Sequence, residues 1–330
     1  MCLESNLAGS YAGVRTVVLG ASGFIGRWVA RTLCKSGANV FLFVLDRAIA
    51  EPVFSEYSIA GQVIEIDLLQ SNKVCQALQN IMPSIVFNLA GYGVNPIERN
   101  ELIAYQVNAD LVREICHWIA EFKDKKWSGQ HLVHVGSALE YGNIHNNLAE
   151  DSEPNPTTLY GNSKLAGTKN VARYCPELGI RGLTARLFSV YGPGELPKRL
   201  LPSLLETAST EQPLPLTVGR QKRDFTYVED IAEGLLRLGL STALPGEIVN
   251  LATGVLTSVR DFIETAAKIL HIPQEALLFG AIPTREGEMH HLPVNIQRLK
   301  SLLSWNPATN VPDGIRKTQE WMMIQGRGND

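Results

Sequence analysis

Short apolar segments of strand length alternate with longer segments of helical periodicity from Arg15 to Leu187. Alternation of this kind is typical of successive β-α-β units, whose strands pair in parallel and are covered by helices on both faces. The expected strands are Arg15–Leu19, Val40–Leu45, Gln62–Ile66, Ile85–Leu89, Leu132–Val135 and Gly182–Leu187. The expected helices are Phe24–Cys34, Lys73–Ile81, Glu101–Phe122 and Leu159–Cys175. The pattern predicts an α/β fold built on a doubly wound parallel sheet.

The pattern becomes irregular after Val190, where prolines interrupt the chain and the elements are shorter. The elements expected there are helices Leu200–Ala208, Tyr227–Gly239, Val259–Leu270 and Ile296–Leu303, and a strand near Glu247–Leu251. We therefore expect two lobes, residues 14–190 and residues 191–330, with the second smaller and interleaved with the first. Residues 326–330 read as a loose tail.

Composition excludes several classes of protein. The chain has 330 residues, 30 Lys and Arg against 33 Asp and Glu, and a net charge of −3, so it lacks the basic footprint of a nucleic-acid binder. The longest apolar run, Val40–Leu45, is far shorter than the roughly twenty residues that span a bilayer, and no secretory signal is recognisable. The five cysteines are scattered, and His290 and His291 lack a surrounding ligand framework. We expect a cytoplasmic protein with reduced thiols and without a metal site.

A glycine-rich segment, Gly20-Ala21-Ser22-Gly23-Phe24-Ile25-Gly26, joins the first expected strand to the first expected helix. The first glycine permits a tight turn, the second lets the backbone approach a pyrophosphate, and the third lets helix and strand pack closely. The helix N-terminus presents free N–H groups and a partial positive charge to that anion. A purely structural turn is the alternative. The context predicts a dinucleotide site contacted by Gly20, Ser22, Gly23, Phe24, Ile25 and Gly26.

Three residues predict proton and hydride chemistry. Tyr160 and Lys164 lie four residues apart, about one helical turn, so both side chains can face one cleft. An ammonium beside a tyrosine favours the phenolate, which lowers the tyrosine pKa from about 10 toward neutrality and makes the phenol a usable general acid or base. Ser137 lies 23 residues before Tyr160, at the end of an expected strand. This spacing predicts acid–base chemistry at Tyr160 and Lys164.

From Val17 to Pro307 the chain resembles the extended short-chain dehydrogenases/reductases, the NAD-dependent epimerases and dehydratases that modify nucleotide sugars. The segments that carry the resemblance are Gly20–Gly26, Ser137–Gly142, Tyr160–Lys164, Arg186–Gly194 and Arg223–Asp230. The resemblance implies a Rossmann-type sheet with a smaller α/β substrate-binding lobe and a nucleoside-diphosphate sugar as substrate. It also implies that Ser137, Tyr160 and Lys164 are catalytic. Tyr160 exchanges a proton with a sugar hydroxyl, while Lys164 bonds the nicotinamide ribose and Ser137 orients the sugar oxygen.

The cofactor contacts leave NAD and NADP both open. An acidic residue after the second strand accepts hydrogen bonds from the ribose of NAD, whereas an arginine there pairs with the extra phosphate of NADP. This chain supplies both, as Asp46 and Arg47. The resemblance further implies contacts from Asp67 and Leu68 with the adenine, and from the segment Leu89-Ala90-Gly91 beside the cofactor.

The resemblance also implies the substrate contacts. Ser137 and Ala138 face the sugar, while Arg223 and Arg285 bind the nucleotide and its diphosphate. The planar guanidinium matches phosphate oxygens and stays charged, although a salt bridge of Arg223 with a neighbouring carboxylate is the structural alternative. Ser189 takes the place of an asparagine that contacts the diphosphate in the family.

The reaction type follows from the residues after Ser137. Sugar 4,6-dehydratases of the family have Asp-Glu where this chain has Ala138-Leu139, and neither of these can move a proton. We therefore expect hydride transfer at a ring carbon, which by resemblance is carbon 4, by a 4-epimerase or a 4-ketoreductase. A catalytically silent dinucleotide-binding sensor is the alternative from another class. The base, the sugar and the pathway are not readable from the sequence.

The family commonly forms dimers through two helices of each subunit, which correspond here to Glu101–Phe122 and Leu159–Cys175. The first of these has a broad apolar stripe, which serves either the core or an interface. The resemblance implies a homodimer.

Overall fold

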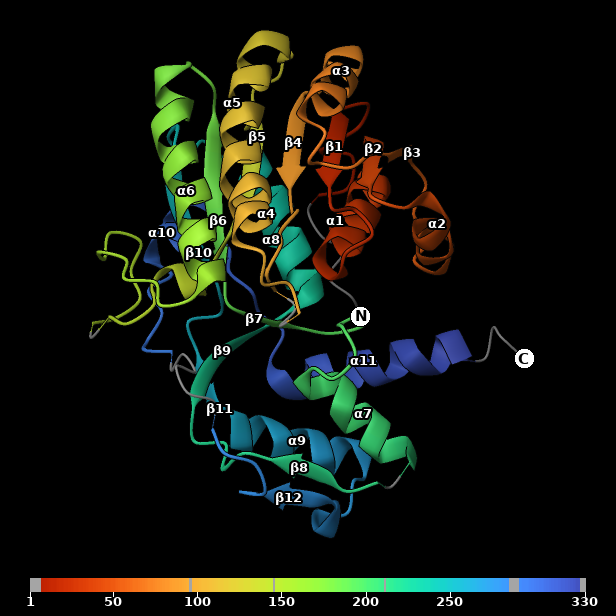
Figure 1. Ribbon diagram of the computed structural model, residues 1–330. Coiled ribbons are helices and arrows are strands. Elements are labelled where there is room, and N and C mark those ends of the chain that lie inside the picture. Colours follow the sequence, from red (N-terminus) through yellow and green to blue (C-terminus); the bar gives the residue numbers. More distant parts are fainter. Residues whose placement is uncertain (1–6, 95–96, 145, 211, 285–290, 327–330) are drawn as a thin grey trace.

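A seven-stranded parallel sheet forms the larger part of the computed structural model, which describes residues 7–94, 97–144, 146–210, 212–284 and 291–326. The strand order is β10-β6-β5-β4-β1-β2-β3 (Figure 1). The strands are β1 (Arg15–Leu19), β2 (Asn39–Val44), β3 (Gln62–Glu65), β4 (Ile85–Asn88), β5 (Leu132–Ser137), β6 (Gly182–Leu187) and β10 (Glu247–Leu251). The reversal of order beside β1 is that of a Rossmann-type sheet, so the predicted fold class is confirmed.

Helices cover both faces of this sheet. One face carries α1 (Phe24–Lys35) and α8 (Val228–Leu240), which pack against each other; the other carries α3 (Ser71–Ile81), α5 (Leu111–Phe122) and α6 (Leu159–Glu177). Neighbouring residues of β1 point to opposite faces, since Val18 belongs to the apolar core under α1 and Val17 to the core under α5. Both faces of the strands are therefore buried, which explains their continuous apolar sequences.

Two helical segments differ from the sequence-based expectation. The predicted helix over residues 101–122 is confirmed in its extent, but it contains a π-helical turn (Gln106–Asp110) between α4 (Glu101–Tyr105) and α5, which the sequence did not predict. A further helix, α2 (Arg47–Glu56), was not predicted; it contains Pro52. The Asp46 side chain caps this helix by accepting a hydrogen bond of 3.0 Å from the Ile49 N–H.

The smaller lobe has its own core. It contains the three-stranded sheet β11-β9-β7, the parallel pair β8-β12, and three longer helices. The elements are β7 (Ser189–Tyr191), α7 (Leu200–Thr210), β8 (Leu214–Leu216), β9 (Lys222–Tyr227), β11 (Leu256–Ser258), α9 (Val259–Leu270), β12 (Leu277–Phe279) and α11 (Val311–Gly326). Phe225 of β9 stacks on Phe262 of α9 with ring centroids 4.3 Å apart.

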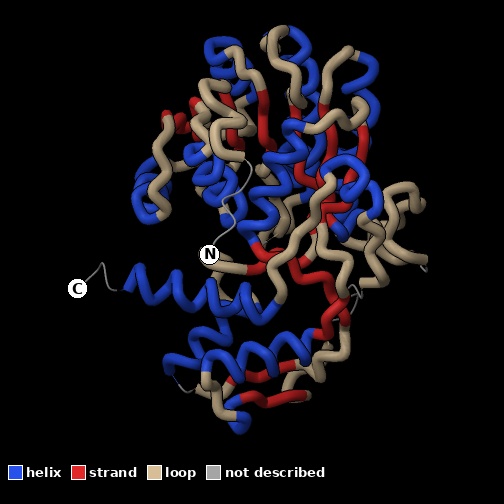
Figure 2. Tube along the Cα trace, turned by 180° about the vertical axis from the view of Figure 1, so that it is seen from behind, coloured by secondary structure: helices blue, strands red, loops and turns tan. Residues whose placement is uncertain are grey.

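The chain crosses between the lobes more than once. α8 and β10, which the sequence assigned to the second lobe, return to the first, because β10 pairs in parallel with β6 and α8 packs on α1. The short helix α10 (Gln297–Leu303) also packs against β10. Figure 2 shows α11 between the two lobes, where Trp321 lies 4.9 Å from Trp28 and 5.0 Å from Tyr57, measured between ring centroids. No helix in the described part of the chain is long and apolar enough to cross a membrane.

Candidate functional site

The glycine-rich turn forms an open cradle between β1 and α1. Gly20 has a φ of +76°, which favours glycine, and a Cβ atom there would lie 3.1 Å from the Ala90 backbone nitrogen. A Cβ atom on Gly26 would collide with the Gly20 carbonyl oxygen. No described side chain caps α1 at Gly23, and its first turn, Phe24 to Arg27, contains no acidic residue. The N–H groups of this turn therefore lack a side-chain partner and are suited to bind a dinucleotide pyrophosphate.

The other residues predicted to contact a cofactor lie around this cradle. Ser22 is half-buried, and its carbonyl accepts a 2.9 Å hydrogen bond from the Arg27 guanidinium. Phe24, Ile25 and Leu89 pack against the core beneath α1, while Ala90 is buried. Gly91 follows at the exposed end of this segment, after β4.

The region after β2 is more acidic than the sequence suggested. Arg47 turns toward β3, donating a 2.7 Å hydrogen bond from Nη2 to the Val63 carbonyl and lying 3.5 Å from the Glu51 carboxylate. Its backbone N–H donates to Glu65 Oε2 at 2.9 Å. Sequence reasoning did not identify Glu65. The carboxylates of Asp46 and Glu65 therefore flank the residue expected to attract the NADP phosphate.

Asp67 and Leu68 lie on the next loop, after β3. Asp67 Oδ1 accepts a 2.9 Å hydrogen bond from the Leu69 N–H, which shapes the turn before α3. The Leu68 side chain packs against the core under α5. Both residues follow the carboxyl end of a strand beside β2, where an α/β sheet binds its ligands.

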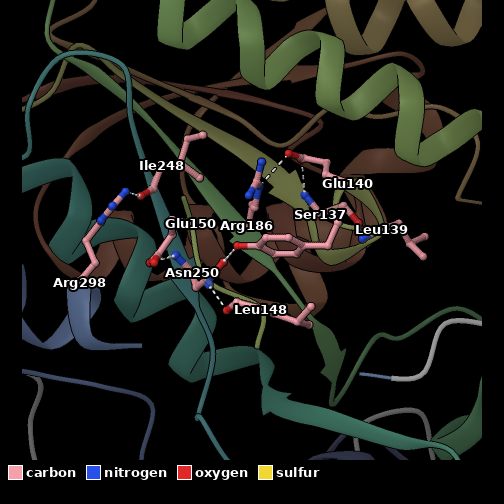
Figure 3. A network of polar contacts seen from close by, with 10 residues as sticks. Ser137, Leu139, Glu140, Leu148, Glu150, Arg186, Ile248, Asn250 and Arg298 are labelled. Carbon is pink, nitrogen blue, oxygen red and sulfur yellow. Dashed lines mark hydrogen bonds and ion pairs between the residues drawn. The ribbon is translucent and has the colours of Figure 1, made fainter. Parts of the chain in front are cut away.

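Ser137 ends β5 and caps the short 3₁₀ turn that follows it. Its hydroxyl accepts a 3.2 Å hydrogen bond from the Leu139 N–H, and its own N–H donates to Glu140 Oε1 at 2.7 Å. Glu140 is fully buried and forms an ion pair with Arg186, whose Nε donates to Glu140 Oε2 at 2.9 Å. Figure 3 shows these contacts together with Asn250, which joins the same network through Tyr141.

Tyr160 and Lys164 lie on the first turns of α6, against the 3₁₀ turn after Ser137. A Cβ atom on Gly161 would collide with the Leu139 carbonyl oxygen, so the two segments are in direct contact. The Tyr160 ring lies beside Gly93, where a Cβ atom would approach its Cδ2 to 3.4 Å. The structure thus brings the three predicted catalytic residues to one region.

Burial dominates the electrostatics of this pair. It lowers the pKa of Lys164 from its ordinary 10.5 to about 8, while the negative charge of Glu140 acts in the opposite direction. Burial also raises the pKa of Tyr160 well above its ordinary value, and Glu140 and Glu98 add to this effect while Arg199 opposes it. The expected lowering of the phenol pKa toward neutrality is therefore not found, because loss of hydration outweighs the favourable charges.

Asn108 is a buried residue of the site that sequence reasoning missed. It lies in the π-helical turn, and its Nδ2 donates to the Tyr92 carbonyl at 2.8 Å and to the Ser163 hydroxyl at 2.9 Å. Its Oδ1 accepts from the Tyr92 N–H at 3.0 Å. The asparagine thus joins the segment after Gly91 to the helix of Tyr160. Its position inside a long apolar helical stripe was the available signal.

The predicted substrate residues are described in part. Ala138 is buried in the 3₁₀ turn, Ser189 begins β7, and Arg223 lies in β9, whereas Arg285 lies outside the described residues. The loop after β7 brings Arg199 close to the segment beside Tyr160, since its Nη2 lies 3.4 Å from the Val94 carbonyl. Within the described residues, no group of three or more His, Cys, Asp or Glu could hold a metal ion.

Comparison with known proteins identifies relatives along almost the whole chain. The model of the "NAD dependent epimerase/dehydratase family" matches residues 16–252. The uncharacterized UDP-glucose epimerase YtcB of Bacillus subtilis is 25% identical over 310 residues, covering 92% of this chain and 96% of that protein. The dTDP-6-deoxy-L-talose 4-dehydrogenase (NAD(P)(+)) of Kitasatospora kifunensis is 27% identical over 323 residues, with 93% and 95% covered. The chain spans 47% of a trifunctional UDP-glucose 4,6-dehydratase of Arabidopsis thaliana, RHM2, which is 24% identical and matches 94% of this chain.

Solved structures share the fold. The epimerase Mth375 of Methanothermobacter thermautotrophicus superposes with a TM-score of 0.84 at 24% identity, covering 98% of this chain and 96% of that one. The UDP-glucuronic acid 4-epimerase of Bacillus cereus, in complex with UDP-glucuronic acid and NAD, gives a TM-score of 0.81 at 23% identity, with 94% and 99% covered.

Proposed function

Because the chain belongs to the NAD dependent epimerase/dehydratase family, we propose that it transfers hydride at carbon 4 of a nucleoside-diphosphate sugar, as a 4-epimerase or a 4-ketoreductase. The observation that carries the proposal is the contact between the start of α6, with Tyr160 and Lys164, and the turn that follows Ser137. The nicotinamide cofactor, when bound, supplies the hydride acceptor or donor. The relatives named above, a UDP-glucose epimerase and a 4-dehydrogenase, support this class of reaction.

Each residue has a role that follows from its contacts. Ser137 Oγ accepts from the Leu139 N–H, so its own hydrogen is left to donate to the reacting sugar oxygen. Tyr160 takes the proton of a sugar hydroxyl during oxidation and returns a proton to the ketone during reduction. Lys164, buried one helical turn after Tyr160, supplies a hydrogen-bond donor to the nicotinamide ribose. The pyrophosphate fits the N-terminus of α1.

The two residues after Ser137 argue against a 4,6-dehydratase. Elimination needs side chains that move protons at the two neighbouring carbons, and this chain has Ala138 and Leu139 there. The sensor hypothesis requires no catalytic phenol. Retention of Tyr160 and Lys164 on one turn of α6 therefore favours an enzyme.

NAD fits the site after β2 better than NADP does. Asp46 and Glu65 are both carboxylates, and the guanidinium of Arg47 is engaged by Val63 and Glu51. A 2′-phosphate there would face two negative charges, whereas a ribose diol can donate hydrogen bonds to a carboxylate.

The homodimer remains a proposal from the family. In the described structure Val112, Ile115 and Ile119 of α5 are buried inside the subunit, so most of the apolar stripe serves the core. Leu102 on α4 is exposed and is available to a partner. Sedimentation at micromolar concentration tests the proposal, and a monomer contradicts it.

The decisive experiment is a panel of UDP-, dTDP-, GDP- and CDP-sugars and their 4-keto forms, incubated with the purified protein and either nicotinamide cofactor. An epimerase converts a sugar without net change in absorbance at 340 nm, whereas a ketoreductase consumes the reduced cofactor. Absence of turnover on the whole panel, with cofactor binding intact, contradicts both activities and supports the sensor.

A further inference from the structure

A buried ion pair lies directly beneath the catalytic serine. Glu140 is 0% exposed and Arg186 is 1% exposed. Glu140 uses both carboxylate oxygens, since Oε1 accepts from the Ser137 N–H at 2.7 Å and Oε2 accepts from Arg186 Nε at 2.9 Å. The Ser137 backbone is therefore attached to β6 as well as to its own strand.

The surrounding residues leave this carboxylate little freedom. A Cβ atom on Gly136 would lie 2.5 Å from Glu140 Oε1, so a glycine is needed where the carboxylate passes. The Arg186 guanidinium lies over the Tyr141 ring, 4.4 Å from its centroid, and the Tyr141 hydroxyl donates to Asn250 Oδ1 at 2.7 Å. The ion pair is thus fixed from both sides (Figure 3).

A buried pair of this kind is weak evidence for a role in stability, because desolvation of two charges offsets much of their attraction. In the capping box of this turn, formed by Ser137 and the residue three positions later, an uncharged glutamine would serve as well as Glu140. What distinguishes a carboxylate here is its charge, which is buried in the 3₁₀ turn that contacts the start of α6, where Tyr160 and Lys164 lie.

We propose that Glu140 is a positioning residue of the catalytic site, which holds the Ser137 backbone in place and supplies a buried negative charge in the turn that contacts the start of α6. The inference rests on the proposed hydride-transfer function, because it assigns Glu140 a part in that reaction. The charge favours the ammonium form of Lys164, in agreement with the direction in which Glu140 moves its pKa.

Other charged groups act on the same residues. Arg199 and Glu98 face Tyr160, and the buried imidazole of His134 lies near Lys164, whose charge contributes with burial to a lowered His134 pKa. Arg186 partly balances Glu140. The substitutions at Glu140 leave these four groups, Arg199, Glu98, His134 and Arg186, unchanged in the sequence.

Two variants separate charge from position. Glu140→Gln keeps the shape and an acceptor for the Ser137 N–H but removes the charge. Glu140→Asp keeps the charge but is too short to reach Ser137 and Arg186 together. Glu150→Gln is the matched control, since Glu150 is a buried carboxylate of the same network that accepts from the Asn250 N–H and touches no catalytic residue.

The pKa of Lys164 is measured by competitive acetylation and mass spectrometry, which need no substrate. Glu140→Gln is expected to lower this pKa, whereas Glu140→Asp and Glu150→Gln leave it unchanged. With the sugar that the wild-type protein turns over, both changes at Glu140 lower kcat, by up to about 10²-fold for a serine displaced by about 1 Å. KM for the cofactor stays constant.

An unchanged Lys164 pKa in Glu140→Gln overturns the proposed charge, and a wild-type kcat in Glu140→Asp overturns the proposed positioning. If the wild-type protein turns over no sugar, hydride transfer is contradicted, while the Lys164 titration still decides the role of the charge. If Glu140→Gln does not fold because Arg186 is left unpaired, Glu140→Asp, which keeps the opposite charge, decides by its kcat.

Discussion

The Asn108 side chain donates a 2.9 Å hydrogen bond to the Ser163 hydroxyl, which in turn donates to the Tyr160 carbonyl at 3.1 Å. One buried amide therefore joins the π-helical turn to the helix that carries the proposed acid–base residue. Single π-helical turns inside α-helices are frequent at functional sites. Here the turn directs Asn108 toward both Tyr92 and Ser163.

Replacing Asn108 by alanine should impair turnover and stability together. The change leaves the Tyr92 backbone N–H and carbonyl without a partner and removes the donor to the Ser163 hydroxyl, which costs about 1–3 kcal/mol of unfolding free energy. Urea unfolding and kcat measure the two effects. Asn170→Ala is the control, because Asn170 also links α6 to the π-helical turn, through the Ala109 carbonyl at 2.9 Å, but lies farther along the helix from Tyr160. Equal kcat values for the two variants contradict the assignment.

Tyr160→Phe should remove turnover and leave cofactor binding intact. The phenyl ring keeps its packing beside Gly93, while the proton donor and acceptor is lost, so kcat is expected to fall by about 10²–10⁴-fold. Tyr174→Phe on the same helix, whose ring lies 5.2 Å from that of His117, is the matched control. Binding of NADH is followed by fluorescence. A Tyr160→Phe protein with wild-type turnover would remove the phenol from the mechanism.

The local sequence pattern predicted most strands of the sheet and the positions of the motifs. Strands β1 and β6 and the glycine-rich turn could be predicted because each depends mainly on residues close together in the sequence. It did not detect the π-helical turn, because the one-residue shift that such a turn introduces into the apolar pattern is hidden within the broad stripe of residues 101–122. Helix α2 was missed because Pro52 interrupts a short segment and because Asp46, which is its N-cap, also suited a ribose contact. The return of β10 to the sheet depends on pairing with a strand some sixty residues earlier, Gly182–Leu187.

The chemical surroundings of the site were less accessible to sequence reasoning. Glu65 at the end of β3 approaches Arg47 at the start of α2, and Arg186 approaches Glu140 from 46 residues away. The direction of the Tyr160 pKa depends on burial, which no spacing of residues encodes. The charged neighbours and the burial of the site residues therefore became visible only from contacts between segments that are distant in the sequence.

Lys164 should make stability depend on pH in the alkaline range. Its pKa is about 8 in the folded protein and ordinarily 10.5, so between these values the unfolded chain holds the proton and the folded one does not, and stability rises with pH. Full deprotonation removes a penalty of about 3 kcal/mol. Lys164→Met should therefore exceed the wild-type protein in unfolding free energy at pH 7 and lose that advantage by about pH 10.5. Urea unfolding of both proteins at each pH gives the difference between their unfolding free energies, in which the contributions of the other ionising groups cancel. A difference that does not change with pH contradicts the lowered pKa of Lys164.

NADH should bind more tightly than NADPH, by at least about tenfold, because each like-charge contact with a phosphate costs on the order of 1 kcal/mol or more in a partly dry site. Asp46→Asn keeps the cap of α2 and removes one charge, and Glu65→Gln removes the other while still accepting from the Arg47 N–H. The double variant should bring the two dissociation constants together, mainly by strengthening NADPH binding. Glu177→Gln, an exposed change at the far end of α6, is the control. Tighter binding of NADPH by the wild-type protein would show that Arg47 leaves Val63 to bind the phosphate.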